Sequence, residues 1–293
     1  MEEWRVGLAQ ISPVLGDVQR NLELHLDMVR RAHTQQVQLL CFPELSLTGY
    51  ALKDIVADVA IPAVEGNPIL AELLSASQDM DLLVGFVEQD RRHRYYVAAA
   101  YLSEGQLLHV HRKVYLPTYG MFEEGRYFAS GDRCRAFDSP FARVGVLLCE
   151  DFWHMSSAYA LWLDGADVLL LMSASPEAAL GSSRSLELIN QTYATLLTDF
   201  VLHCNRVGFE DGMNFWGGST VFGPDGILVS QAPYFEEALL TATLDLSALR
   251  RVRLQLPLLR DERPRLLRRE LKRIAHGRDS GDASMRGFRT PSG

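Results

Sequence analysis

The sequence lacks any apolar run long enough to cross a bilayer. Its apolar stretches, such as Val168 to Met172, fall far short of the roughly 18 to 20 residues that a membrane-spanning helix needs. The start of the chain also lacks a basic segment followed by an apolar one, because Met1-Glu2-Glu3-Trp4 leads directly into a strand-like run. We therefore expect a cytoplasmic protein with no membrane partner.

Cysteines are few, and none is paired in sequence. The four cysteines, Cys41, Cys134, Cys149 and Cys204, show no C-x-x-C spacing. This scarcity argues against a zinc cluster or a disulfide framework. An isolated free thiol is most often a small buried apolar side chain, so each cysteine by itself predicts core packing.

Positive charge is also in deficit, since 29 Lys plus Arg against 37 Asp plus Glu give a net charge of −8. That balance argues against a general nucleic-acid-binding protein. The apolar content of 47% in turn excludes a chain that is disordered as a whole. The composition is that of a folded globular protein.

One segment departs from this acidic composition. Residues 250–273 carry ten Lys or Arg against three acidic residues. We interpret the segment as a solvated helix or a subunit-docking arm. RNA binding is a more specific alternative that the charge run favours less. We place one domain at residues 1–260 and a basic C-terminal arm at 261–293, with disorder expected after His276.

Short β-type runs alternate with helical patterns along most of the chain, which predicts an α/β fold of two sheets with helices outside. Gly223-Pro224-Asp225-Gly226 between two such runs predicts a tight hairpin. The expected strands are residues 4–9, 38–42, 82–88, 95–102, 107–111, 143–148, 168–172, 200–206, 219–222, 227–231 and 238–244. The expected helices are residues 18–36, a segment opening at Asn67-Pro68, residues 156–164 and residues 185–198.

Three of the apolar runs end at a side chain that can do chemistry, which is where α/β proteins place their sites. Glu44 follows the first and could exchange a proton, Lys113 follows the second and could hold an oxyanion, and Cys149 follows the third and could act as a nucleophile. Taken singly, each has an ordinary interpretation: a surface carboxylate, a solvated cation and a buried structural thiol. The three together favour a site.

Histidines offer alternatives to this set. His109 and His111, with Arg112, look like outward-facing positions on an alternating strand, although either histidine could be a base. His154, five residues after Cys149, leaves a Cys–His pair as another possibility, but a polar loop histidine is the commoner case.

The segments around these strand ends resemble the nitrilase (carbon–nitrogen hydrolase) superfamily, and within it the glutaminase domains of glutamine-dependent NAD⁺ synthetases. The similarity extends from about Trp4 to about Leu259 and contains three motifs in the expected order. They are Phe42-Pro43-Glu44-Leu45 with Thr48-Gly49-Tyr50, Arg112-Lys113 with Leu116-Pro117 and Tyr119-Gly120, and Gly145-Val146 with Cys149-Glu150-Asp151-Phe152-Trp153.

The resemblance implies a role for each matching residue. Glu44 would be the general base and acid, Lys113 the cation that stabilises the oxyanion, and Cys149 the nucleophile. Glu124 matches a second carboxylate, which orients Lys113 and the substrate amide. For the substrate-binding residues, Tyr119 matches a residue of the glutamine pocket and Ser175 falls where those domains hold the α-carboxylate.

The resemblance also implies a four-layer α-β-β-α sandwich that pairs through helices into a homodimer or a higher homo-oligomer. The activity it implies is cleavage of a carboxamide C–N bond to a carboxylic acid and ammonia through a thioester, with no metal or organic cofactor. Other linear amides, N-carbamoyl compounds and nitriles remain alternative substrates. A non-catalytic scaffold protein is disfavoured because all four matching side chains are of a competent type.

Two departures from the glutaminase pattern bear on the substrate and on partners. A basic residue usually follows the serine within a few positions, whereas here residues 177–181 are neutral or acidic and Arg184 is the first cation. No Ser-Gly-Gly-x-Asp-Ser loop, GxGxxG motif or Walker loop occurs, so we expect this chain alone not to bind ATP or make NAD⁺. A separate ammonia-using synthetase is a possible partner.

Overall fold

The protein is described by a computed structural model over residues 3–63, 66–177 and 183–285, with side chains as far as residue 276. The chain divides into two compact units, Met1–Leu256 and Pro257–Gly293. This division falls just before the domain boundary that we placed after residue 260. Within the described residues, no helix combines the length and the apolar character that a bilayer span requires.

The first unit contains two six-stranded sheets. In order across the first sheet, the strands are β14 (Ala238–Asp245), β1 (Glu3–Gln10), β2 (Leu39–Cys41), β3 (Asp81–Gln89), β4 (Tyr95–Ser103) and β5 (Gln106–Arg112). Strand β1 pairs antiparallel with β14 and parallel with β2, and β2 also pairs in parallel with β3. The N-terminal strand β1 is therefore an interior strand of the sheet, next to the edge strand β14.

The second sheet has a parallel centre and antiparallel edges, because β7, β8 and β9 run in parallel. The predicted hairpin at Gly223 is confirmed: β12 and β13 pair antiparallel around it, and the Gly223 N–H donates to the Ile227 carbonyl at 2.9 Å. In order, the strands are β13 (Leu228–Gln231), β12 (Thr220–Phe222), β9 (Phe200–Asn205), β8 (Val168–Ser173), β7 (Arg143–Leu148) and β6 (Phe137–Asp138).

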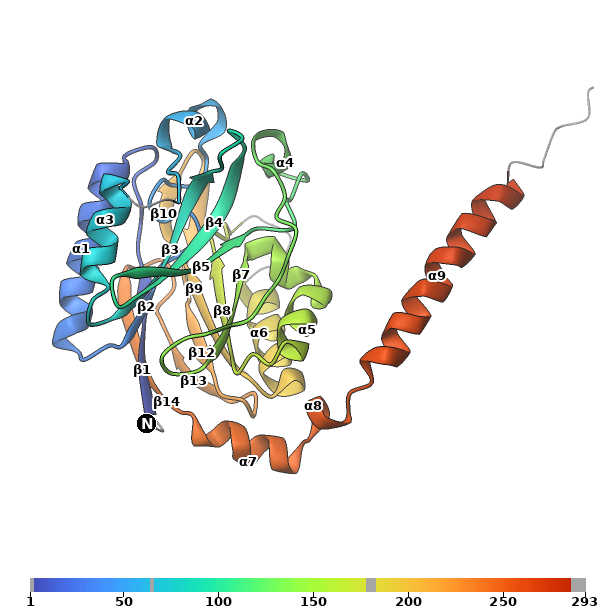
Figure 1. Ribbon diagram of the computed structural model, residues 1–293. Coiled ribbons are helices and arrows are strands. Elements are labelled where there is room, and N and C mark those ends of the chain that lie inside the picture. The colour runs from blue at the N-terminus through green and yellow to red at the C-terminus, as the bar shows by residue number, and fades with distance from the viewer. Residues whose placement is uncertain (1–2, 64–65, 178–182, 286–293) are drawn as a thin grey trace, which may run out of the picture. The chain divides into compact units, whose positions relative to one another are not determined.

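Helices cover the outer face of each sheet, which confirms the four-layer α-β-β-α sandwich (Figure 1). On the first sheet lie α1 (Val18–Thr34) and α3 (Pro68–Ala76), and on the second lie α5 (Met155–Leu163) and α6 (Ser183–Leu197). The starts of α1 and α3 follow from their caps, since Asp17 and Asn67 each accept a backbone N–H from the first turn. All four correspond to predicted helices.

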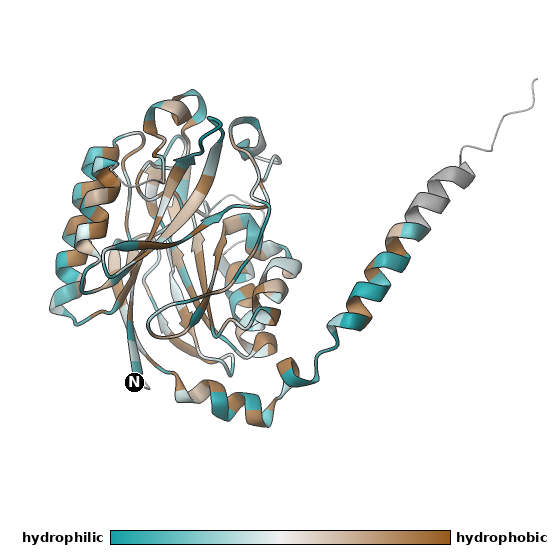
Figure 2. Ribbon diagram, in the orientation of Figure 1, coloured by the Kyte–Doolittle hydropathy of each residue, from teal (hydrophilic) through white to brown (hydrophobic). Residues whose placement is uncertain are grey.

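The hydrophobic core lies mainly between the two sheets. Trp4 and Leu8 of the first sheet share one buried cluster with Val146, Leu170 and Leu202 of the second. Figure 2 shows the apolar residues concentrated along these strands, whereas polar and apolar residues alternate along helix α1. A second cluster packs α1 and α3 against the outer face of the first sheet.

Several elements were not expected from the sequence. A separate hairpin of β10 (Val207–Glu210) and β11 (Met213–Trp216) follows β9, and the chain also forms η1 (Lys53–Ile55), α2 (Val56–Val59), α4 (Glu124–Tyr127) and η2 (Cys149–Trp153). Helix α7 (Ser247–Gln255) overlaps the start of the segment 250–273, for which a solvated helix was one of our two main interpretations. The second unit contains α8 (Leu258–Asp261) and α9 (Pro264–Met285). Helix α9 continues past His276, after which we expected disorder, and residues 286–293 lie outside the described residues.

Candidate active site

The three chemically competent side chains stand where strands end. Glu44 comes three residues after β2, Lys113 directly follows β5, and Cys149 directly follows β7. All three are removed from solvent, because Glu44 and Lys113 are 0% exposed and Cys149 is 9% exposed. A buried charge of this kind needs partners within hydrogen-bonding distance.

Lys113 is the centre of a buried ionic cluster. Its Nζ donates to Oε1 of Glu44 at 2.8 Å and to Oε1 of Glu124 at 2.7 Å. The same Oε1 of Glu124 accepts the phenolic O–H of Tyr50 at 2.6 Å. The structure thus brings together the two carboxylates and the cation that the sequence singled out.

Glu44 is held by backbone contacts as well as by Lys113. Its Oε2 accepts the backbone N–H of Ala174 at 3.0 Å, which ties it to the end of β8. The backbone on both sides of it lies directly against Gly85 of β3, where an added Cβ would be 2.4 Å from the Pro43 carbonyl oxygen and 2.6 Å from the Leu45 nitrogen. Only glycine leaves room for this approach.

The Lys113 ammonium stays charged in the pocket. Burial by itself lowers the pKa of Lys113, but the carboxylates of Glu124 and Glu44 outweigh burial and raise that pKa well above its usual value. Two of the three N–H donors are used by these carboxylates, which leaves one for an incoming oxygen. Its backbone is fixed too, since the Lys113 N–H donates to the Val97 carbonyl at 2.9 Å.

Cys149 occupies a strained turn between strand β7 and helix η2. Its φ is 43°, in the left-handed region that non-glycine residues rarely adopt. Burial raises the pKa of the thiol well above its usual value, Glu44 raises it further, and Lys113 opposes this shift. Cys149 is therefore a neutral thiol in the resting site and must lose its proton before it can attack.

Glu124, at the start of α4, has one oxygen without a partner. Its Oε2 is buried and accepts no hydrogen bond from the described part of the chain. Burial raises the pKa of Glu124 to about 7, although the charge of Lys113 pulls it down. An unpartnered buried acceptor costs free energy, which a donor arriving with a substrate would recover.

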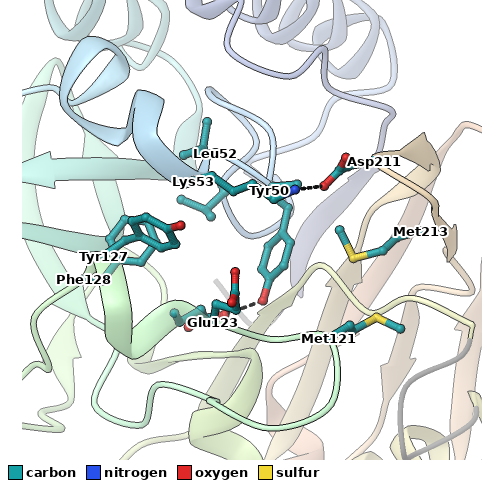
Figure 3. A pocket seen from close by; sticks show the side chains of 12 residues that line it. Tyr50, Leu52, Lys53, Met121, Glu123, Tyr127, Phe128, Asp211 and Met213 are labelled. Atoms are coloured by element: carbon teal, nitrogen blue, oxygen red, sulfur yellow. Dashed lines mark hydrogen bonds and ion pairs between the residues drawn. The ribbon is translucent and has the colours of Figure 1, made fainter.

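A small cavity of about 70 Å³ adjoins Glu124. Figure 3 shows the ring of Tyr50 with Tyr127 and Phe128 on one side and Met213 on the other, and the Lys53–Asp211 ion pair (2.6 Å) close by. Tyr50 is positioned there by its backbone N–H, which donates to Oε1 of Glu210 at 2.8 Å. Tyr50 belongs to the first of the three motifs, but the sequence alone assigns it no role.

The two predicted substrate-binding residues lie next to the cluster. Ser175 follows Ala174, the residue that binds Glu44, and its backbone N–H donates to Oδ1 of Asn205 at 3.0 Å. Tyr119 is 45% exposed, and its O–H donates to Oε2 of Glu150 at 2.8 Å. Glu150 adjoins Cys149 and adds a third carboxylate, after Glu44 and Glu124, which the sequence analysis did not single out.

The first basic residue after Ser175 in the sequence is Arg184. Arg184 is exposed on α6, on the wall of a surface pocket with Glu187 and Leu188. Residues 178–182, where the sequence offered no cation, lie outside the described residues.

The expectation that His111 faces outward was wrong. His111 is 3% exposed, and its Nε2 lies 2.8 Å from Oδ2 of Asp151. The alternation along β5 could not reveal that the second sheet covers this face. His154 stacks on Tyr115 at 3.6 Å between ring centroids and lies 3.7 Å from Glu150, and none of the described contacts joins it to Cys149.

No group of three or more His, Cys, Asp or Glu side chains in the described ranges has an arrangement that could hold a metal ion. The chemistry open to the cluster is that of a thiol, two carboxylates and an ammonium group.

Comparison with known proteins identifies the family that the chain matches. The model of the family described as carbon–nitrogen hydrolase matches residues 5–254. The glutamine-dependent NAD(+) synthetase of Thermotoga maritima is 33% identical over 262 residues, which cover 87% of this chain and 44% of that protein. The chain thus spans less than half the length of this relative.

Two of the solved structures that are similar to this chain are an NAD⁺ synthetase and an amidase. A glutamine-dependent NAD⁺ synthetase from Acinetobacter baumannii, in complex with ADP, is 30% identical with a TM-score of 0.76 over 84% of this chain and 46% of that one. A mutant amidase from Nesterenkonia sp. AN1 is 25% identical with a TM-score of 0.77 over 91% and 96%, and carries the acetamide moiety of fluoroacetamide on its active-site cysteine.

Proposed function

The chain belongs to the carbon–nitrogen hydrolase family, and we propose that it hydrolyses a carboxamide to a carboxylic acid and ammonia through a thioester on Cys149. The observation that carries this proposal is the buried cluster of Lys113 with Glu44 and Glu124 next to that thiol. These side chains supply a nucleophile, a proton acceptor and a fixed positive charge in one enclosed place.

In the first half of the reaction, Glu44 takes the thiol proton while Sγ of Cys149 bonds to the amide carbon. The carbonyl oxygen becomes an oxyanion, which accepts the remaining N–H of Lys113. Glu44 then passes the proton to the amide nitrogen, the C–N bond breaks, and ammonia leaves behind a thioester.

In the second half, Glu44 removes a proton from water as the water oxygen attacks the thioester carbon. The C–S bond breaks, the acid is released, and Cys149 recovers its proton. Throughout, the unpartnered Oε2 of Glu124 is available to accept an N–H of the substrate amide. That bond would fix the plane of the amide against Lys113.

For the substrate we propose glutamine or a similar ω-amide. Glu150 and Tyr119 place a carboxylate and a phenol beside Cys149, and a carboxylate there suits a substrate that carries an ammonium group. The names of the NAD(+) synthetase relatives, which are glutamine-dependent, support the same substrate. Ammonia could be released freely or passed to a separate synthetase.

A second candidate is a simple aliphatic amide. The absence of a cation between Ser175 and Arg184 in the sequence, and the likeness to an amidase over most of both chains, favour this alternative. N-carbamoyl compounds and nitriles are further options that the same catalytic groups could serve.

The test is ammonia release by the purified chain from glutamine, butyramide, an N-carbamoyl amino acid and an aliphatic nitrile. We expect glutamine to be the best substrate, with Cys149→Ala inactive and Cys134→Ala, at a half-exposed thiol outside the cluster, fully active. Preference for butyramide would select the second candidate, and carbon dioxide released with ammonia would indicate carbamoyl cleavage. Full activity of Cys149→Ala would refute the mechanism.

A further inference from the structure

Asp151 is a buried carboxylate that the proposed reaction does not use. Its side chain is 0% exposed, yet it sits two residues after the nucleophile in helix η2. A carboxylate in such a place is costly unless several donors satisfy it. The structure supplies four of them.

These donors come from both sheets. Oδ1 of Asp151 accepts the backbone N–H groups of Val114 and Tyr115, each at 2.9 Å. Oδ2 lies 2.8 Å from Nε2 of His111 and accepts the backbone N–H of Leu148 at 3.2 Å. Every one of these contacts involves a residue within two positions of Lys113 or the residue directly before Cys149.

The contacts therefore join the segment that carries Lys113 to the segment that carries Cys149. His111, Val114 and Tyr115 flank Lys113 at the end of β5, in the first sheet, while Leu148 precedes Cys149 at the end of β7, in the second. Lys113 and Cys149 belong to different sheets, so no strand pairing sets the distance between them. The Asp151 carboxylate links the two backbones directly, because its acceptors bind N–H groups of both segments.

We propose that Asp151 is a positioning residue, which fixes the Lys113 ammonium relative to Sγ of Cys149 and holds the strained turn at Cys149. This inference rests on the proposed function for its rate measurements. Without the link, the oxyanion would form away from the remaining N–H of Lys113, and a displacement of about 1 Å in such a site can cost about a hundredfold in rate.

The decisive variant is Asp151→Asn, because it keeps the size of the side chain and removes acceptor capacity. The amide has one oxygen for four donors, and its NH₂ group faces N–H groups that it cannot accept. We expect kcat to fall about a hundredfold with KM nearly unchanged, since binding contacts remain and only the alignment of reacting groups is lost.

A matched control separates positioning from general stability. Asp81 is also a buried carboxylate, 5% exposed, which accepts the O–H of Tyr101 at 2.6 Å at the start of β3. Asp81→Asn should lower the unfolding midpoint in urea while leaving kcat per folded molecule at the wild-type value. A kcat loss in Asp81→Asn as large as in Asp151→Asn would overturn the proposal, as would a folded Asp151→Asn enzyme with wild-type kcat.

A second measurement does not depend on amide hydrolysis. In a Cys134→Ala background, the rate of Cys149 alkylation by iodoacetamide reports the position and protonation of the thiol, and peptide mapping separates Cys149 from Cys41 and Cys204, which are also buried. We expect slower alkylation in Asp151→Asn and an unchanged rate in Asp81→Asn. If the wild-type chain hydrolysed no amide, the proposed function would fail while this comparison still tested Asp151.

If Asp151→Asn does not fold, His111→Asn decides the question. Its shorter side chain removes one of the four donors and leaves the three backbone contacts in place. We expect a smaller fall in kcat, on the order of fivefold to tenfold, with KM unchanged. An unchanged kcat in folded His111→Asn would then refute the positioning role.

Discussion

Replacement of Glu124 by glutamine tests the electrostatics of the site through stability. The amide oxygen can still accept from Lys113 and from Tyr50, so the packing around the pocket is retained. What is lost is a carboxylate that burial keeps from ionising at its usual pH. The variant therefore removes a pH-dependent contribution to the free energy of unfolding.

The sign and size of that contribution follow from the pKa of Glu124. Burial raises it from 4.5 to about 7, so between these values the folded chain holds a proton that the unfolded chain has released. The stability of the wild-type chain therefore falls as pH rises through this window. A shift of this size corresponds to a loss on the order of 3 kcal/mol at pH values above the folded pKa.

The free energy of unfolding of Glu124→Gln should not show this fall with rising pH, because the variant has no carboxyl group at this position. Its NH₂ group replaces the unpartnered Oε2 and costs about 1–3 kcal/mol as an unsatisfied donor, but that cost does not vary with pH. Urea unfolding from pH 4.5 to just above 7 should show the wild-type stability falling relative to Glu124→Gln by on the order of 3 kcal/mol.

The matched control is Glu123→Gln, at a neighbouring carboxylate whose side chain is 56% exposed. This variant should track the wild-type chain across the whole pH range. If the difference between the wild-type chain and Glu124→Gln were constant with pH, or if Glu123→Gln reproduced it, the burial argument for Glu124 would be wrong.

Other variants test the remaining parts of the site. Lys113→Met should lower kcat/KM by roughly a thousandfold or more, because several kcal/mol of oxyanion stabilisation are lost, and wild-type ammonia release would contradict its role. Gly85→Ala should reduce both activity and urea resistance, because its Cβ would press on the Pro43 carbonyl; an unaffected enzyme would refute that close approach. Arg253→Ala leaves the buried Asp199 without its 2.7 Å partner, and burial holds the pKa of Asp199 at about 8. Destabilisation should therefore be larger above this pH than below it, and an equal loss of unfolding free energy at both would contradict the account.

Much of the fold could be predicted because its strands and helices are locally encoded. The alternation of β runs and helices gave the two sheets, and Asn67-Pro68 marked the start of a helix that the structure confirms. The hairpin of β10 and β11 was missed although Asp211-Gly212 between its two strands is a typical hairpin signal. Each of these strands is only four residues long, so the period-two pattern that marks a strand is short there.

The residues of the site also divide into those that the sequence could predict and those that it could not. Glu44, Lys113 and Cys149 could be found because each lies at or shortly after the end of a strand-like run, and the structure brings the two charged residues into contact. Asp151 and Tyr50 could not be assigned roles, since their partners lie far away in the sequence. His111 was misplaced because period-two alternation does not reveal which face of an edge strand a second sheet covers.

The most direct test of the account is mass spectrometry of the intact chain after rapid mixing with glutamine and acid quenching. The account predicts a glutamyl adduct that peptide mapping places on Cys149, together with ammonia in the supernatant, and no adduct in Cys149→Ala. Ammonia release with no acyl group on Cys149 under any quench, or an adduct on Cys134 instead, would contradict the central claim.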